Sequence, residues 1–277
     1  MSSTVLRITI ITVCLNSENY IEKTIQSVLA QSYPNIEYIV IDGNSSDNTL
    51  TIINKYRTEI GIILSEKDAG IYDAMNKGIS LSTGDIIYFL NSGDLLYDNV
   101  ILEKVVNIFI ENTEYPMVYG DLLFYLERRE KYISNNRRDL VEFLIYGTSH
   151  QSLFVRKKLF ETVGLFNTKF TILADKDWLL RSIIGKGLPI MYIGMPVCYF
   201  LAGGISCQYR NEYFFEDSRI IRDYLDNPVI KQSIRSNPLL FIQLLSIILF
   251  LELNKITIKI FNKNFAIYLK RVKDACF

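Results

Sequence analysis

The chain has 277 residues, of which 49% are hydrophobic and 22% charged, and its 30 basic residues balance its 30 acidic residues. This is the composition of a folded protein, and it excludes a disordered chain, which combines low hydrophobicity with high net charge. The zero net charge argues against a nucleic-acid-binding protein, which usually carries a basic excess. The length predicts one or two domains.

The cysteines are too few and too scattered for a structural metal or disulfide framework. They are Cys14, Cys198, Cys207 and Cys276, and the single histidine, His150, is far from all of them in the sequence. We therefore expect no zinc cluster, and we expect reduced thiols rather than disulfides. The N-terminal segment lacks the charged and apolar regions of a secretory signal, which predicts a cytoplasmic chain.

In the first 120 residues, short apolar runs rich in β-branched residues alternate with helical patterns. The predicted strands are 7–13, 36–41, 60–64 and 86–90. The predicted helices begin at Ile21, at Ser46 or Asp47, and at Ile71, and the last of them ends at Leu81. Such alternation predicts right-handed crossovers and an α/β fold with a mainly parallel sheet.

The pattern changes after about Tyr119. We predict strands at 122–126, 152–155 and 190–200 and a helix at 176–184, with irregular connections between them.

The C-terminal segment has a different character. Residues 239–251 are apolar except for Gln243 and Ser246. As a helix this run would be about 20 Å long, shorter than the roughly 30 Å hydrocarbon core of a bilayer. The residues after it carry six basic and two acidic side chains, with Lys255, Lys259 and Lys263 on one helical face. An apolar run followed by a basic amphipathic segment favours association with a membrane surface, and the alternative is a helical core subdomain with a solvated basic face.

Acidic residues follow several predicted strands: Asp42, Asp68, Asp94 and Asp121. A single acid at a strand end is most often a turn or a helix cap. Acids at several strand ends share one edge of an open α/β sheet, which is where ligands bind. Together they predict a divalent cation, Mn²⁺ or Mg²⁺, between the acids and an anionic ligand.

The usual glycine-rich phosphate loops are missing. The chain has neither GxxxxGK[ST] nor GxGxxG, and the turn after the first strand, CLNSEN, contains no glycine. This argues against a dinucleotide-dependent dehydrogenase and against a nucleotidyltransferase that makes sugar nucleotides.

Four stretches together resemble family 2 glycosyltransferases with a GT-A fold, and within them the subgroup that makes bacterial surface polysaccharides. They are TVCLNSENYIEKTIQSVLAQSYPNIEYIVIDGNSSDNT, SEKDAGIYDAMNKGI, GDIIYFLNSGD and ADKDW. The resemblance covers residues 8–204 and implies a Rossmann-like, mainly parallel sheet flanked by helices. We therefore expect a GT-A catalytic domain at 1–210 and a helical, membrane-associating extension at 211–277.

The resemblance also implies which residues bind the nucleotide-sugar. They are Thr12, Cys14, Asn16, Glu18, Asp42, Gly43, Ser45, Lys67, Asp68, Asp73, Lys77, Asn91 and Ser92. Asp42 would hold the base of the nucleotide, typically uracil, and Gly43 and Ser45 would allow its close approach.

Asp94 matches the last acid of the family's metal-binding DxD-type motif. Where the family often has another acid, this chain has Asn91, whose amide oxygen ligates a cation without adding charge. The resemblance therefore implies a cation site in which the diphosphate supplies more of the ligands. The alternative for Asn91–Asp94 is a plain turn between a strand and the next element.

Asp175 matches the family's catalytic base, and Asp177 matches the acid two residues later. A carboxylate in this role takes the proton from the acceptor hydroxyl, and attack from the face opposite the diphosphate inverts the anomeric configuration. Alternatively, both acids only complement the dipole of a helix N-terminus. His150 is expected near the acceptor or diphosphate, or as a structural group. Trp178 is expected as a core residue or as a sugar-stacking platform.

The sequence thus predicts an inverting, metal-dependent glycosyltransferase of hexosyl or N-acetylhexosaminyl type. Its expected donor is a UDP-sugar, and its expected acceptor is a polyprenyl-diphosphate-linked or growing glycan of an O-antigen, capsule or exopolysaccharide. We expect it at the inner face of the cell membrane, with no nucleic-acid partner. The alternative is a non-catalytic subunit that binds a nucleotide or a glycan.

Overall fold

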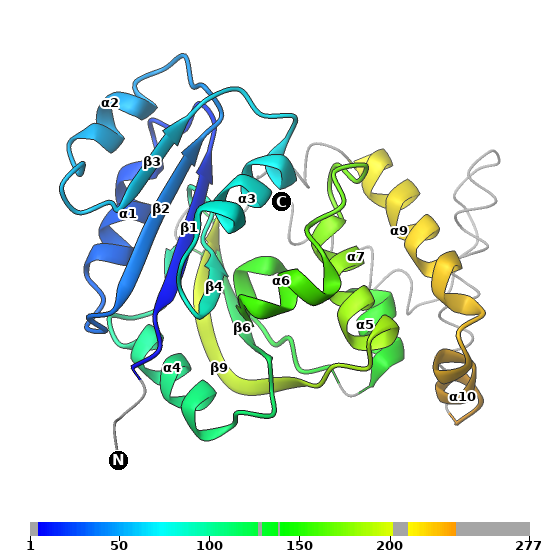
Figure 1. Ribbon diagram of the computed structural model, residues 1–277. Helices are drawn as coiled ribbons and strands as arrows, with labels where there is room; N and C mark the ends of the chain where they lie inside the picture. The colour runs from blue at the N-terminus through cyan, green and yellow to red at the C-terminus, as the bar shows by residue number, and fades with distance from the viewer. Residues whose placement is uncertain (1–4, 127–128, 138, 202–209, 237–277) are drawn as a thin grey trace. The chain divides into compact units, whose positions relative to one another are not determined.

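The computed structural model describes residues 5–126, 129–137, 139–201 and 210–236 (Figure 1). The chain divides into two compact units. The first is formed by 1–136 and 148–201, and the second by 137–147 and 202–277. Every strand of the described chain belongs to the first unit.

The N-terminal half of the first unit is a parallel sheet in the order β3-β2-β1-β4. Its strands are β1 (Ile8–Cys14), β2 (Ile36–Asp42), β3 (Ile62–Ser65) and β4 (Ile86–Phe89). The helices between them are α1 (Ile21–Leu29), α2 (Thr49–Asn54) and α3 (Ile71–Leu81). All seven residues of β1 are buried, as is typical of a central parallel strand covered on both faces. The predicted strand–helix alternation is confirmed here.

The rest of the sheet is mixed, so the prediction of a mainly parallel sheet is wrong for this part. The later strands are β5 (Leu95–Leu96), β6 (Met117–Leu126), β7 (Arg129–Ile133), β8 (Leu153–Arg156) and β9 (Ile190–Leu201). Only β6 and β9 pair in parallel, whereas β4–β8, β6–β8, β6–β7 and β5–β9 are antiparallel. The short connection between β6 and β7 permits only a hairpin, because a parallel pair needs a crossover of a dozen or more residues.

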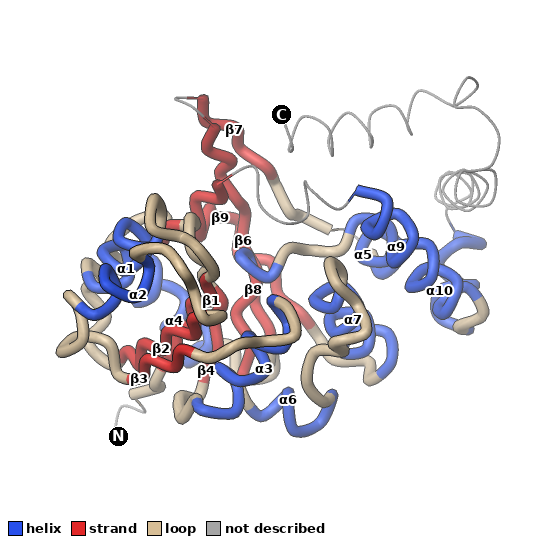
Figure 2. Tube along the Cα trace, turned by 90° about the horizontal axis from the view of Figure 1, so that it is seen from above, coloured by secondary structure: helices blue, strands red, loops and turns tan. Residues whose placement is uncertain are grey.

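Helices cover both faces of the sheet (Figure 2). The first face packs against α1, α2 and α4 (Ile101–Glu111) through alternate residues of β1, Ile8 and Ile10. The other face packs against α3, where a Cβ on Gly78 would lie 2.5 Å from Cγ2 of Ile11. Glycine at position 78 therefore allows α3 to approach the sheet closely.

The last elements of the first unit carry the C-terminal part of the candidate site. They are the 3₁₀ turn η1 (His150–Ser152), α6 (Lys158–Val163) and α7 (Ala174–Leu180), which continues as a π-helical turn over Arg181–Gly185.

The second unit contains α5 (Leu140–Tyr146), α9 (Arg210–Leu225) and α10 (Pro228–Ser236), which contact one another. The carboxylate of Asp139 caps α5 by accepting 2.9 Å hydrogen bonds from the backbone amides of Val141 and Glu142. Within the described ranges, no helix combines the length and apolar character needed to span a bilayer. The predicted apolar and basic segments, 239–251 and 255–263, lie outside the described residues.

Candidate functional site

The loops that follow β1 and β2 are tied together at the carboxyl edge of the sheet. Asn16 Oδ1 accepts from the backbone amide of Ser46 at 2.9 Å, and the Asn16 amide donates to Ser45 Oγ at 2.8 Å. Glu18 Oε2 accepts from the backbone and side-chain nitrogens of Asn48 at 3.0 and 2.8 Å. The side chains of Asn16 and Glu18, predicted to bind the nucleotide, thus hold the adjacent loop in place.

Asp42 ends β2 and is fully buried. Its Oδ2 accepts from Ser65 Oγ at 2.6 Å. A Cβ on the next residue, Gly43, would lie 2.6 Å from Asp68 Oδ2, so glycine is needed for this approach. Burial, helped by the negative charge of Asp42, raises the pKa of the Cys14 thiol, which keeps it protonated. These predicted nucleotide-binding residues lie together at the ends of β1 and β2.

Lys77 holds the loop between β3 and α3. Its ammonium group lies 2.8 Å from Glu66 and 3.5 Å from Asp73, and it donates to the Lys67 carbonyl at 3.0 Å. The hydrogen bond to Glu66 raises the pKa of Lys77, which secures its positive charge. Asp73 also accepts from the amide of Ala69 at 3.0 Å. Both residues predicted on this helix therefore fix the loop that carries Lys67.

Two predicted ligand-contacting residues lie in the interior instead. Thr12 is fully buried, with its hydroxyl 3.1 Å from that of Tyr38. Trp178 is 1% exposed, donates from Nε1 to the Gly164 carbonyl at 2.7 Å and packs on Phe160 with 4.7 Å between ring centroids. Trp178 is therefore the core residue that one interpretation predicted, because a ring without exposed surface offers no platform to a sugar.

Asp177 is engaged by an arginine one helical turn later. Its carboxylate accepts from Arg181 Nε at 2.9 Å, and the guanidinium also donates to the carbonyls of Val163 and Leu165 at 2.6 and 2.9 Å. This arrangement anchors α7 to the loop before it, so Asp177 supports the helix that carries Asp175.

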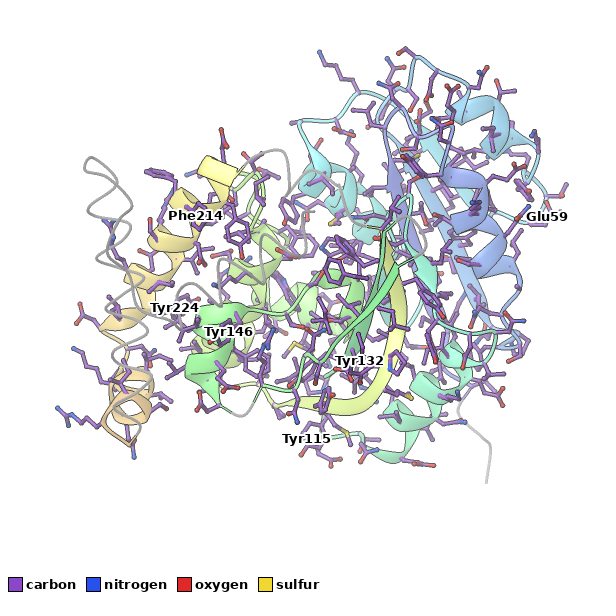
Figure 3. The ribbon with its side chains drawn as sticks, turned by 180° about the vertical axis from the view of Figure 1, so that it is seen from behind. Glu59, Tyr115, Tyr132, Tyr146, Phe214 and Tyr224 are labelled. Carbon is purple, nitrogen blue, oxygen red and sulfur yellow. The ribbon has the colours of Figure 1, made fainter. Side chains whose placement is uncertain are left out.

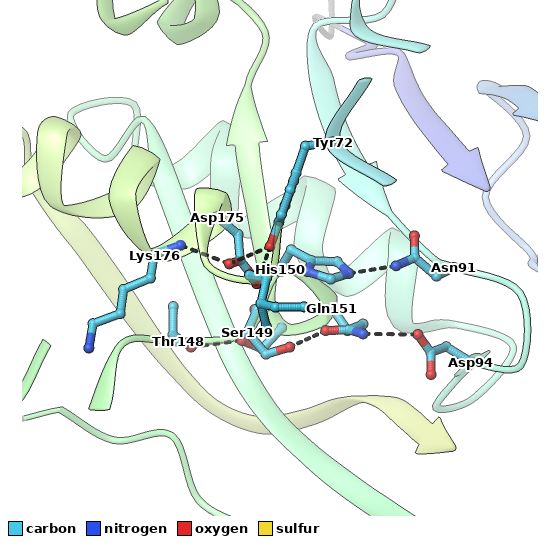
Figure 4. A network of polar contacts seen from close by, with 11 residues as sticks. Tyr72, Asn91, Asp94, Thr148, Ser149, His150, Gln151, Asp175 and Lys176 are labelled. Carbon is cyan, nitrogen blue, oxygen red and sulfur yellow. Dashed lines mark hydrogen bonds and ion pairs between the residues drawn. The ribbon is translucent and has the colours of Figure 1, made fainter. Parts of the chain in front are cut away.

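A continuous chain of polar contacts joins four elements at the start of α7 (Figure 4). Asp175 Oδ1 accepts from the Tyr72 hydroxyl of α3 at 2.9 Å. Asp175 Oδ2 lies 3.0 Å from His150 Nδ1 of η1. His150 Nε2 lies 2.8 Å from Nδ2 of Asn91, in the turn after β4. Residues 72, 91, 150 and 175 are thus brought together, although the sequence separates the outer two by 103 positions.

The charge on Asp175 is fixed by these contacts. Burial alone would raise the pKa of Asp175, but the hydrogen bonds from His150, from the Tyr72 hydroxyl and from the Lys176 amide outweigh it and lower that pKa. A carboxylate can only accept, so Nδ1 of His150 carries the hydrogen. In the neutral ring Nε2 then accepts from the Asn91 amide, and one tautomer satisfies both contacts.

Asp94 lies in the same turn as Asn91 but is 4% exposed. Its carboxylate accepts from the Leu201 amide and from Gln151 Nε2, both at 3.1 Å. Burial raises the pKa of Asp94 to about 7, because it outweighs the opposing effects of His150 and of the hydrogen bonds from the Leu201 amide and Gln151.

The turn Asn91–Asp94 has the atoms that a hard cation needs, although few of them are charged. Asn91 Oδ1 and Ser92 Oγ are buried and have no hydrogen-bond partner. Among the residues that the structure describes, no group of three or more histidines, cysteines or acids could hold a metal ion. The turn therefore fits Mg²⁺ or Mn²⁺ only with further oxygen ligands from a bound diphosphate.

The sequence predicted Asp121 at the end of a strand, and this prediction is wrong. Strand β6 continues to Leu126, and Asp121 is fully buried within it. Its carboxylate accepts from the Tyr192 hydroxyl at 2.7 and 2.8 Å, from the Asn135 amide at 2.6 Å and from the hydroxyl of Tyr132. Tyr132 is among the side chains labelled in Figure 3. With its acceptor sites used inside the protein, Asp121 has a structural role.

Two members of the site, Tyr72 and Gln151, were missed from the sequence. Tyr72 lies inside the stretch SEKDAGIYDAMNKGI, beside Asp73, and Gln151 follows His150. Both were next to predicted residues, but neither is a carboxylic acid or a histidine, so reasoning from acids and bases did not identify them.

A scan against family models matches residues 9–174 to the model described as "Glycosyl transferase family 2". The chain belongs to glycosyl transferase family 2. The matched range contains Asn91, Asp94 and His150 and ends one residue before Asp175. The predicted family is confirmed, whereas the surface-polysaccharide subgroup stays a prediction.

Relatives of this family 2 chain include mycobacterial enzymes. It is 32% identical over 197 residues to a PGL/p-HBAD biosynthesis glycosyltransferase of Mycobacterium bovis, covering 69% of this chain and 76% of the relative. It is 29% identical over 223 residues to the uncharacterized glycosyltransferase Rv1514c of Mycobacterium tuberculosis, covering 78% of this chain and 83% of the relative.

Solved structures share the GT-A-like fold. S. aureus TarS 1–349 in complex with UDP-GlcNAc superposes with a TM-score of 0.68 at 18% identity, covering 90% of this chain and 73% of TarS 1–349. The mannosyltransferase PcManGT from Pyrobaculum calidifontis, in complex with GDP-Man and Mn²⁺, gives a TM-score of 0.63 at 17% identity, covering 87% and 74%. At these identities the likeness establishes the fold.

Proposed function

We propose that this family 2 chain is an inverting glycosyltransferase. It moves a sugar from a nucleotide-sugar, a UDP-sugar in our proposal, to a hydroxyl group of a lipid-linked or growing glycan. The observation that carries the proposal is the chain of contacts from Asp175 through His150 to Asn91. It holds a charged carboxylate in fixed relation to a turn with two unpartnered oxygens. The UDP-GlcNAc of TarS and the GDP-Man of PcManGT support a nucleotide-sugar as donor.

Asp175 is the base in this proposal. Its Oδ1 accepts from the Lys176 amide and from the Tyr72 hydroxyl, each at 2.9 Å, and the Tyr72 hydroxyl also contacts the Ile172 carbonyl at 2.5 Å. Asp175 Oδ2 accepts from His150 Nδ1, which leaves one lone pair for the proton of an acceptor hydroxyl. A base placed in this way typically contributes about 10² to 10⁴-fold to the rate.

A divalent cation completes the donor site. Asp94 would supply its charged ligand, Asn91 Oδ1 and Ser92 Oγ would supply neutral oxygens, and the donor diphosphate the rest. When bound, Mn²⁺ or Mg²⁺ stabilises the negative charge that develops on the departing nucleoside diphosphate. The Mn²⁺ in the PcManGT structure supports this assignment. The loops after β1, β2 and β3, with Asp42, Gly43 and Lys67, would hold the nucleoside.

We further propose that the acceptor is polyprenyl-diphosphate-linked and that the chain works at the inner face of the cell membrane, in O-antigen, capsule or exopolysaccharide synthesis. In the second unit, Phe215 on α9 is 72% exposed. Arg219 and Arg222 follow at spacings of four and seven, on the same helical face. An exposed aromatic ring beside basic residues suits a lipid headgroup region. The extension that follows the catalytic domain, 211–277, would carry this contact.

The test is a thermal-shift panel of nucleotide-sugars with and without Mn²⁺, followed by a transfer assay. The acceptor is a polyprenyl-diphosphate-linked N-acetylglucosamine, and the anomeric configuration of the product is read by NMR. We expect one donor to raise the melting temperature in the presence of Mn²⁺ and to be transferred with inversion. Donor binding without any release of nucleoside diphosphate would refute the proposal and support the non-catalytic subunit instead.

A further inference from the structure

The segment that carries His150 is fixed on both sides of the imidazole. The Tyr88 hydroxyl of β4 donates to the Gln151 carbonyl at 2.6 Å, and the Tyr88 ring stacks on Phe154 of β8 with centroids 4.0 Å apart. On the other side, Ser152 Oγ lies 2.8 Å from Thr148 Oγ1 and donates to the Ser149 carbonyl, also at 2.8 Å. Turn η1 is therefore held by contacts with β4 and β8, so the backbone that carries the His150 ring is fixed in position.

Both ring nitrogens of His150 are occupied by protein groups. Nδ1 faces Asp175 at 3.0 Å and Nε2 faces Asn91 at 2.8 Å, and 12% of the His150 side chain is exposed. Neither nitrogen is free for an acceptor hydroxyl or a diphosphate. The next residue, Gln151, donates to Asp94 at 3.1 Å. The dipeptide His150–Gln151 therefore contacts the proposed base and both polar ends of the Asn91–Asp94 turn.

We propose that His150 is a positioning residue that acts through two separable contacts of one ring. Through Nδ1 it holds the carboxylate of Asp175 for proton transfer. Through Nε2 it fixes the Asn91 amide with its nitrogen toward the ring, which leaves the unpartnered Oδ1 for the donor or its cation. This inference rests on the proposed function.

The two contacts predict different kinetic effects. Loss of the Nδ1 contact frees the Asp175 side chain to rotate, which lowers kcat because a base must be aligned in the transition state. Loss of the Nε2 contact lets the Asn91 amide turn, which weakens donor binding and raises the donor KM. A histidine that merely filled space would change both constants together, or neither.

Two conservative variants separate these contacts. In His150→Asn the side-chain nitrogen stands as many bonds from the backbone as Nδ1 does, so this variant can still donate to Asp175. In His150→Gln the terminal amide reaches as far as Nε2 and can still accept from Asn91. Each variant therefore keeps one contact and loses the other.

The experiment measures kcat and the donor KM of both variants with the UDP-sugar that the unaltered protein uses and the polyprenyl-diphosphate-linked acceptor, in the full-length protein. For His150→Asn we expect the donor KM to rise about tenfold with kcat within about threefold of the original, and for His150→Gln a loss of kcat of about 10 to 100-fold with little change in KM. His150→Ala should show both effects. Lys104→Gln is the control, since Lys104 forms an exposed pair with Asp98 on another part of the unit.

The melting temperature of each variant shows whether it is folded, and the kinetic constants of folded variants decide the outcome. If both variants alter kcat and KM in the same proportion, or if neither alters them, the inference is wrong while the proposed function stands. If the unaltered protein transfers no sugar from any donor, the proposed function fails and this inference fails with it. The opposite split, with KM raised by the Gln variant, would also overturn the assignment of the two contacts.

Discussion

Replacing Asp175 with asparagine keeps the size of the side chain but removes its charge. It also replaces one of the two oxygens that accept hydrogen bonds with an NH₂ group that donates them. The three groups that face the carboxylate, namely the Tyr72 hydroxyl, the Lys176 amide and His150 Nδ1, all donate to it. Wherever the new NH₂ group points, it meets a donor, and one hydrogen bond is lost at a cost of about 1–3 kcal/mol. The least costly relief is a change of tautomer in His150, which in turn requires the Asn91 amide to rotate.

We therefore expect Asp175→Asn to lower kcat by about 10² to 10⁴-fold, or roughly 3 to 5 kcal/mol of transition-state stabilisation, since the base is gone. Donor affinity should fall by at most about tenfold, because only the Asn91 contact is disturbed. Release of nucleoside diphosphate gives kcat, and calorimetric titration with the donor gives the affinity.

Asp226→Asn is a matched control, because this acid is 96% exposed and pairs only on the surface, with Lys231 at 2.8 Å. Turnover of Asp175→Asn within tenfold of the original rate would show that another group takes the proton. An equal loss of donor binding and turnover would show that Asp175 serves binding instead.

Three further expectations concern stability and location. Gly78→Ala should destabilise the protein by about 1–3 kcal/mol in thermal denaturation, because the new methyl group would stand 2.5 Å from Ile11 Cγ2; an unchanged melting temperature would mean that α3 moves freely. Burial raises the pKa of Asp94 to about 7, above its value in the unfolded chain. The protonated Asp94 side chain therefore contributes fully to stability below about pH 4. This contribution is lost as the pH rises through 7, by roughly 4 kcal/mol at most. Urea unfolding at pH 5 and 8 should show this loss in the ligand-free protein and not in Asp94→Asn, and parallel curves would refute it. Removal of residues 237–277 should weaken sedimentation with anionic lipid vesicles, and equal partitioning of the full and shortened chains would contradict a membrane role for the tail.

Local pattern was sufficient for the N-terminal half of the fold. Strands β1, β2 and β4 are short runs rich in apolar and β-branched residues, and α3 was predicted with the same ends, Ile71 and Leu81, as in the structure. Helix α4 was missed, although its buried residues repeat at helical spacing: Ile101, Leu102, Val105, Val106 and Phe109. The pairing of β4 with β8 and of β6 with β9 joins residues far apart in the chain, and periodicity within a segment holds no information about such partners.

The resemblance to the family indicated the residues of the candidate site but not the use of each side chain. Asp175, His150 and Asn91 were all predicted, and the structure adds that His150 contacts the other two. Trp178 and Asp121 were each compatible with a surface role until their burial was known. The sequence does not show whether a carboxylate faces a ligand or a tyrosine, so only its neighbours in the structure reveal its role.

The cross-bonded loops after β1 and β2 have a consequence for evolution of donor choice. Asn16 and Asn44 both adopt left-handed backbone angles, with φ of 48° and 65°, and the two loops exchange hydrogen bonds through Ser45, Ser46 and Asn48. A mutation in either loop is therefore transmitted to the other. In the proposed donor site, selection for a new nucleotide base would therefore have to change the two loops as a pair, and single substitutions should lower the rigidity of the loops before they alter the preference for a base.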